Sequence, residues 1–230
     1  MNVAVVTPRR SDGGRRDELW AWVKDRWHRE HPDFYVFEGH HDDGPFNRSA
    51  AINAAVAQDH DADVYIIADS DSFVSVEQIN QAIHQALEHF QVTFAYDRFC
   101  YLNRQMTAQV MDGFDGNWWP GVEWTMTGTC SSMVVVPGDL WREMGGADEG
   151  FVGWGGEDIG LSLALQALGG GMRRIPGEVW HLFHTPAAHT HDHVWPDRIK
   201  RYEACNYERE PMLALLAELR AEVAAESQPA

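Results

Sequence analysis

Two pairs of carboxylates in this sequence have a spacing that suits metal binding and proton transfer. Asp69 and Asp71 flank a single residue and directly follow the apolar run 64–68. Two carboxylates in that position, at the C-terminal end of a buried strand, suit a hard divalent cation that carries a diphosphate. Glu157 and Asp158 follow a glycine-rich turn and begin a predicted helix, where a carboxylate can act as a base beside that cation.

The glycine-rich turn, residues 153–158, is the most specific of these patterns. Gly155 and Gly156 allow the backbone to approach a bound sugar closely, and the ring of Trp154 can cover that sugar. The alternative is an acidic helix start after a glycine turn, because the helix dipole stabilises negative charge there. That alternative requires neither Trp154 nor the paired glycines, so we favour a functional loop.

The composition excludes some classes of function. The chain has 230 residues, enough for one sizeable hydrophobic core, and a formal net charge of -17. That charge argues against a broad electrostatic interaction with nucleic acid, because phosphates are repelled from most faces. The ten Trp favour carbohydrate binding only weakly, since large aromatic rings also pack cores.

Cysteine usage and the N-terminus predict a cytoplasmic protein. Cys100, Cys130 and Cys205 are odd in number and irregularly spaced, so we expect reduced thiols and not a disulfide framework or a zinc site. A strand-like segment begins directly after Met1 and leaves no room for a signal peptide. No run approaches the ~18 apolar residues of a membrane span.

Strands and helices alternate through the first part of the chain. Hydrophobic periodicity predicts strands at 3–6, 34–37, 64–68 and 92–96, and helices at 17–29, 47–58 and 76–90. This alternation predicts parallel strands with a ligand at their C-terminal ends. Residues 7–10 and 69–71 both fall at such ends, so we expect them to share one site.

The second part of the chain is less regular. Residues 97–128 are rich in Gly, Asp and Trp, and we expect an irregular excursion over the sheet that holds an acceptor. The further elements that we predict are strands at 132–136 and 179–183, and helices at 137–144, 159–168 and 211–225.

The motifs, taken together, resemble those of a known enzyme family. In chain order they are Thr7-Pro8-Arg9-Arg10, Phe46-Asn47-Arg48, Asp69-Ser70-Asp71, Gly145-Gly146, Gly153 to Asp158 and His181-Leu182-Phe183-His184. Over residues 3–185 they resemble GT-A fold glycosyltransferases, most closely the β-1,4-galactosyltransferase type. The resemblance implies an α/β domain at 1–195, with a Rossmann-like mixed sheet and helices on both faces. It leaves a C-terminal helical extension at 196–230.

The resemblance also implies a role for each motif. The residues implied to bind the nucleotide-sugar donor are Thr7, Pro8, Arg9, Arg10, Phe46, Arg48, Asp69, Ser70, Trp154, Gly155 and Gly156. Asp71 is implied to bind a divalent metal with His181, His184 or both, and imidazole ligands favour Mn²⁺ over Mg²⁺. His181 stands where the galactosyltransferases carry a thioether. Asp158 is implied to deprotonate the acceptor hydroxyl, and Glu157 to orient the acceptor or the donor sugar.

Simpler structural explanations exist for several motifs. Arg9 and Arg10 could form a solvated basic turn, and Phe46 could be a hydrophobic staple at a helix start. Asp69 and Asp71 could cap a turn. If they instead continue the strand, both carboxylates point to the same side of it.

The activity that the resemblance implies is transfer of a sugar from a nucleotide-diphosphate donor to a hydroxyl group. A UDP-sugar is the first candidate for the donor. The acceptor could be a glycan, a protein or another hydroxyl compound. Retaining relatives carry an amide where this chain has Asp158, which implies inversion. Two alternatives stay open: a metal-dependent nucleotidyltransferase or phosphotransferase, and a non-catalytic module that binds a nucleotide-sugar or a glycan. The first leaves the Trp154 loop unexplained, and a retained base disfavours the second.

Overall fold

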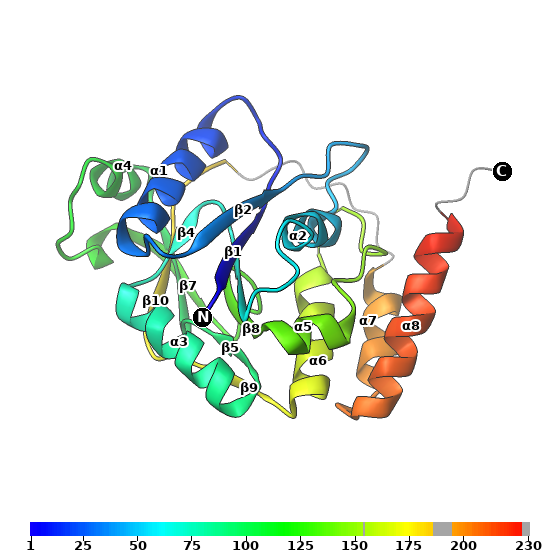
Figure 1. Ribbon diagram of the computed structural model, residues 1–230. Helices are drawn as coiled ribbons and strands as arrows, with labels where there is room; N and C mark the ends of the chain where they lie inside the picture. Colours follow the sequence, from blue (N-terminus) through cyan, green and yellow to red (C-terminus); the bar gives the residue numbers. More distant parts are fainter. Residues whose placement is uncertain (154, 186–194, 227–230) are drawn as a thin grey trace.

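The fold is built on a mixed six-stranded sheet. The computed structural model describes residues 1–153, 155–185 and 195–226, and Figure 1 shows their arrangement. The strands follow the order β2-β1-β3-β8-β5-β9. Their bounds are β1 Val3–Pro8, β2 Tyr35–Gly39, β3 Val64–Ala68, β5 Val92–Phe94, β8 Met133–Pro137 and β9 Met172–Arg174. Strand β8 runs antiparallel to β3 and β5 while the other pairs are parallel, which confirms the expected mixed sheet.

Helices cover both faces of this sheet, as expected. One face carries α1 (Arg15–Glu30) and α3 (Val76–His89), and the other carries α2 (Arg48–Val56), α5 (Gly138–Met144) and α6 (Glu157–Gly169) (Figure 1). Because helices exclude water from both sides, every residue of β1, β3 and β8 is buried. The core is therefore continuous through the strands whose C-terminal ends carry the predicted motifs.

A second sheet of four strands corrects the prediction for residues 97–128. Its order is β4-β10-β6-β7, formed by Ser72–Phe73, Glu178–His181, Arg98–Leu102 and Val122–Thr127. The predicted irregular excursion is wrong, because 97–128 contains β6, helix α4 (Arg104–Met111) and β7. Strand β6 pairs with β10, where Arg98 lies opposite Glu178. Local composition does not reveal a partner so distant in the sequence.

Two helices end the described chain. Helix α7 (Trp195–Ala204), which the periodicity did not predict, packs against α6, and α8 (Arg209–Glu226) packs against both α6 and α7 (Figure 1). The division into a domain at 1–195 and an extension at 196–230 stays a prediction.

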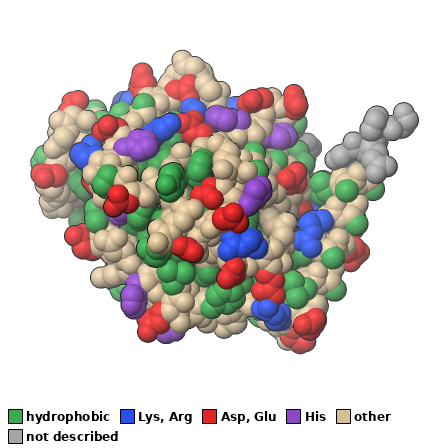
Figure 2. Space-filling model, in the orientation of Figure 1, with side chains coloured by type: hydrophobic (Ala, Val, Ile, Leu, Met, Phe, Trp, Pro, Cys, Tyr) green, Lys and Arg blue, Asp and Glu red, His purple; other side chains and the backbone are tan. Residues whose placement is uncertain are grey.

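Acidic side chains are spread over the surface. The face drawn in Figure 2 shows them interspersed with basic and hydrophobic side chains, in line with the net charge of -17. Among the described residues, no helix combines the length and apolar character needed to cross a membrane.

Candidate metal centre and acidic loop

Strand pairing brings Asp71 to the two histidines. After β3 the chain turns, and the N–H of Ser72 donates to the carbonyl of Asp69 at 3.4 Å. Strand β4 then pairs antiparallel with β10, which places His181 opposite Ser72. The N–H of Leu182 donates to the carbonyl of Asp71 at 2.8 Å, so the end of β10 is fixed against the turn.

Asp71, His181 and His184 form a compact buried cluster. The Nε2 atom of His184 lies 3.0 Å from Oδ2 of Asp71, and Nε2 of His181 lies 3.3 Å from Oδ1. One potential ligand atom from each residue can be chosen so that all three lie within 4.8 Å of one another. Two imidazole nitrogens and a carboxylate oxygen at this separation suit a transition-metal ion such as Mn²⁺.

The protonation of this cluster follows from burial and mutual attraction. Burial lowers the pKa of His181 more than the charge of Asp71 raises it, and a neutral imidazole is the form that binds metal. Burial also acts to lower the pKa of His184, but its hydrogen bond to Asp71 leaves that pKa raised. Burial acts to raise the pKa of Asp71, yet the two histidines hold it well below its usual range. The carboxylate is therefore ionised.

Asp69 belongs to a different cluster. Its Oδ1 atom lies 2.7 Å from Nη2 of Arg48, and Oγ of Ser132 donates to its Oδ2 at 3.1 Å. Burial acts to lower the pKa of Arg48, but attraction to Asp69, Glu157 and Asp158 raises it above its usual value. Arg48 is thus the cation that joins Asp69 to the acidic start of α6.

Of the two arrangements that we considered for residues 69–71, the structure has the turn and not a continuation of the strand. The segment forms a turn after Ala68, with Ser70 and Asp71 as the turn residues. The two carboxylates consequently contact different partners, Arg48 for Asp69 and the histidines for Asp71. The turn arises because β4 leaves the first sheet to pair with β10 in the second.

The acidic loop lies beside the Arg48 cluster. The N–H of Gly153 donates to the carbonyl of Phe46 at 3.3 Å, two residues before Arg48. Glu157 and Asp158 then begin α6. Among the described residues, Oε2 of Glu157 is buried without a hydrogen-bond partner, and burial raises the pKa of this carboxyl group. Oδ1 of Asp158 accepts from the N–H of Ile159 at 2.9 Å.

Gly156 serves packing within the protein. It caps α6 with a φ of 87°, a conformation that side chains other than glycine rarely adopt. A Cβ atom there would lie 2.9 Å from the Cβ of Trp195 and 3.0 Å from the ring of Phe151. Close packing against helix α7 and Phe151 therefore accounts for a glycine at position 156, and the approach of a sugar to Gly155 and Gly156 stays a prediction. Trp154, which we predicted to cover the sugar, lies outside the described residues.

Strand β1 places the motif Thr7-Pro8-Arg9-Arg10 near Phe46. Thr7 and Pro8 end β1, and Arg9 forms ion pairs with Asp17 and Glu38, the second at 2.9 Å.

Arg10 lies over the ring of Phe46, with its guanidinium carbon 5.5 Å from the ring centre. It also donates to the carbonyls of His41 and Gly44, the latter at 2.9 Å. Of the two predicted arginines, Arg10 contacts the predicted base-binding residue, while Arg9 joins β1 to α1 and β2.

Two residues near the cluster were not predicted. The charge of Arg16, on α1, acts on Asp71, His181 and His184. The ring of Tyr101 stacks on His181 with centres 4.7 Å apart, and its hydroxyl donates to the carbonyl of His184 at 2.8 Å. Arg16 is one of four arginines between positions 9 and 16, and this clustering was the only sequence signal for its role. Tyr101 lies in the segment that we expected to be irregular.

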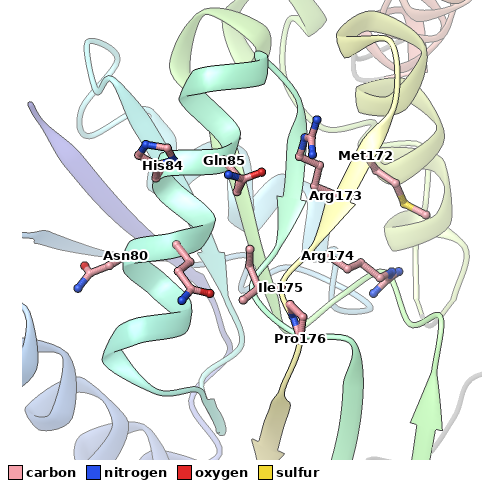
Figure 3. A pocket seen from close by; sticks show the side chains of 9 residues that line it. Asn80, His84, Gln85, Met172, Arg173, Arg174, Ile175 and Pro176 are labelled. Carbon is pink, nitrogen blue, oxygen red and sulfur yellow. The ribbon is translucent and has the colours of Figure 1, made fainter.

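A surface groove lies away from these clusters. It has a volume of about 740 Å³ and lies between α3 and β9, where Gln85 is on the side of α3 toward Arg173 (Figure 3). None of the predicted site residues lines it. We therefore assign the candidate site to the strand ends and not to this groove.

Comparison with known proteins gives structural likenesses only. No family model matches the chain. No curated protein matches it. Among solved structures, the catalytic domain of Drosophila beta1,4galactosyltransferase 7 in complex with xylobiose has a TM-score of 0.48 at 15% identity. That alignment covers 75% of this chain and 64% of the other, so this chain spans a little under two thirds of its length.

Two bacterial structures are similar to a comparable extent. S. aureus TarS 1-349 has a TM-score of 0.48 at 13% identity, with 79% of this chain and 60% of that chain covered. Glucosyl-3-phosphoglycerate synthase from Mycobacterium tuberculosis, in complex with Mn²⁺, UDP and glucosyl-3-phosphoglycerate, has a TM-score of 0.44 at 13% identity, with 95% and 79% covered. At such scores and identities these likenesses establish neither activity nor substrate.

Proposed function

We propose that this protein is a metal-dependent glycosyltransferase. It would move a sugar from a nucleotide-diphosphate donor, with a UDP-sugar as the first candidate, to an acceptor hydroxyl with inversion. The observation that supports this proposal most strongly is the convergence of a metal-competent cluster with an acidic loop. Arg48 contacts Asp69 and attracts Glu157 and Asp158, while Asp71, two residues from Asp69, contacts both histidines.

The cluster fits a divalent cation on its own chemistry. His181, which is buried, has a lowered pKa, and its Nδ1 atom has no hydrogen-bond partner among the described residues. Its Nε2 atom and that of His184 both face the ionised carboxylate of Asp71. Nitrogen ligands favour Mn²⁺ over Mg²⁺, which prefers oxygen. A bound cation would stabilise the charge that develops on a leaving diphosphate.

The two acids of the loop have different surroundings and so different roles. Glu157 is the more buried, and its raised pKa favours the protonated form that donates a hydrogen bond to a sugar or an acceptor. Asp158 accepts a hydrogen bond from the backbone at the start of α6, where the helix dipole stabilises its negative charge. We therefore assign the base that takes the proton of the acceptor hydroxyl to Asp158, and the orienting role to Glu157.

The donor would lie along the ends of β1 and β3. Arg10 and Phe46 form a stacked pair that suits a nucleobase, and Arg16 supplies positive charge near Asp71 for the phosphates. Ser70 lies in the turn that directly follows β3. The acceptor class and the cytoplasmic location stay predictions from the sequence.

A screen of nucleotide-sugars tests the proposal. UDP-, GDP-, dTDP- and CMP-sugars would be compared by thermal shift, each with and without Mn²⁺, and a specific donor should raise the melting temperature only when metal is present. Product analysis with the stabilising donor should show a free nucleoside diphosphate. Release of pyrophosphate would indicate a nucleotidyltransferase, and binding without donor breakdown would indicate a non-catalytic module.

A further inference from the structure

The acidic loop, which leads from Asp148 to Glu157 and Asp158, is hydrogen-bonded to helix α7 at Asp148. Asp148 is the anchoring residue, and its carboxylate is only 7% exposed. Arg198 on α7 binds it through two hydrogen bonds of 2.6 Å, from Nε to Oδ2 and from Nη2 to Oδ1. The hydroxyl of Tyr202, one turn further along α7, donates to Oδ2 at 2.8 Å. A bidentate guanidinium contact of this kind fixes orientation as well as distance.

The same helix also packs along the rest of the loop. The guanidinium of Arg198 lies over the ring of Phe151, 5.6 Å from its centre, and Tyr202 contacts the same ring. Trp195, at the start of α7, fills the space beside Gly156. Helix α7 therefore contacts the loop at Asp148, at Phe151 and at Gly156, which caps α6.

Helix α2 holds the opposite side of the loop. The side chain of Asn47 donates to the carbonyl of Glu149 at 2.7 Å, and that of Asn53 donates to its carboxylate at the same distance. Helix α2 also carries Arg48, which contacts Asp69 and on which the charges of Glu157 and Asp158 act. The loop is thus held between α2, which carries Arg48 of the candidate site, and α7, which follows the loop in the sequence.

We propose that Arg198 and Tyr202 are positioning residues for the acidic loop. They act through Asp148, and so helix α7 determines where Glu157 and Asp158 stand relative to the metal-competent cluster. The effect on turnover rests on the proposed function, whereas the effect on the loop itself does not. Displacement of a reacting group by about 1 Å can lower a rate by about 10²-fold, so loss of this anchor should reduce turnover without loss of donor binding.

The experiment compares four variants in the full-length protein. Arg198→Ala removes both guanidinium hydrogen bonds to Asp148, Arg198→Lys keeps the charge but not the paired hydrogen bonds, and Tyr202→Phe removes the hydroxyl hydrogen bond to Asp148 while keeping the ring. Arg201→Gln is the matched control, because Arg201 lies on the same helix but pairs with Glu222 of α8, at 2.8 Å. Backbone amide exchange over residues 149–158 and steady-state kinetics would be measured for each.

We expect amides of the loop to exchange about 10-fold faster or more in Arg198→Ala, less so in Tyr202→Phe, and at the wild-type rate in Arg201→Gln. The kcat should fall about 10-fold or more in Arg198→Ala and recover partly in Arg198→Lys. The Mn²⁺-dependent affinity for UDP should stay within about twofold of wild type, since the metal cluster and the proposed base-binding pair, Arg10 and Phe46, lie outside the loop.

Tyr202→Phe keeps the test decisive if Arg198→Ala does not fold. The proposal is overturned if the anchor variants and Arg201→Gln show the same loop exchange and the same kcat. If the wild-type protein releases no nucleoside diphosphate from any donor, the proposed function fails, while the exchange data still decide whether α7 orders the loop.

Discussion

Asp69 and Asp71 stand two residues apart, yet their surroundings differ in kind. Asp69 contacts Arg48, which is charged at any pH that the protein meets, and it accepts a hydrogen bond from Ser132. Asp71 contacts two histidines, whose positive charge can be lost. The protein therefore neutralises the first carboxylate permanently and the second only conditionally.

The difference indicates which carboxylate can take a cation. A metal would have to displace the guanidinium of Arg48 to bind Asp69, whereas deprotonated histidines next to Asp71 become additional ligands. We infer that Asp71 carries the metal and that Asp69, through Arg48, links the metal side to the acidic loop. The following predictions test this division, from the largest expected effect to the smallest.

Substitution of Asp71 should have the largest effect on activity. In Asp71→Asn the ligand loses its charge while keeping its shape, so turnover of the donor should fall by about 10³-fold or more, equivalent to several kcal/mol of lost stabilisation of the leaving group. Asp69→Asn is the matched variant, and its turnover should fall less. Equal losses in kinetic assays of the two variants would contradict the division.

Asp158→Asn should separate proton transfer from metal binding. Loss of a general base typically lowers turnover by about 10²–10⁴-fold, and the charge of Asp158 acts on Arg48, while Asp158 is not one of the three metal-competent residues. Kinetics should show this loss, while calorimetry should show Mn²⁺ and UDP binding as in wild type. Retention of full activity would remove the assigned role of Asp158.

Arg48→Met should destabilise the protein more than an exposed control. It leaves the Asp69 carboxylate without its cation, and because this carboxylate is 24% exposed we expect a loss of about 2–3 kcal/mol, below the ~3–5 of fully buried pairs. Arg29→Met breaks an exposed ion pair with Asp25 and should cost less than ~1 kcal/mol. Urea unfolding measures both. A loss no greater than that of Arg29→Met would show that Asp69 does not depend on Arg48.

The contribution of His184 to stability should depend on pH with opposite signs with and without metal. The pKa of His184 is raised above its ordinary value of 6.5, so without metal its pairing with Asp71 stabilises the fold fully below that value. This contribution is lost as the pH rises through the raised pKa. Mn²⁺ requires the neutral imidazole, so its stabilising effect should grow over the same range.

Melting temperatures with and without Mn²⁺, at about pH 6 and about pH 8, measure this dependence. His184→Ala should abolish the difference, and His84→Ala, an exposed histidine paired with Glu88, should preserve it. A Mn²⁺ effect that is independent of pH in the wild-type protein would argue against His184 as a ligand.

Much of the first sheet was predictable from local sequence. The apolar run 64–68 coincides with β3, and the helix predicted at 76–90 matches α3, because its apolar stripe is strongly periodic. The second sheet was not predictable in the same way. Its strands pair across large sequence separations, as β6 with β10 does, and no local pattern encodes such pairing.

In the candidate site, too, contacts between segments that are distant in the sequence were not predictable from local patterns. The resemblance to glycosyltransferases placed Asp71, His181 and His184 together, and the structure has them in contact, although their role as metal ligands stays a prediction. The partners of Asp69 were missed, since they depend on where α2 presents Arg48. The packing reason for Gly156 was also missed, because its neighbour Trp195 belongs to a helix that periodicity did not predict.

Calorimetric titration of UDP, with and without Mn²⁺, tests the division between the two aspartates most directly. The wild-type protein and Asp69→Asn should both bind UDP more tightly when Mn²⁺ is present, and Asp71→Asn should show no such gain. If Asp71→Asn keeps the full Mn²⁺-dependent gain in UDP affinity, the cluster of Asp71 with the two histidines is not the metal site.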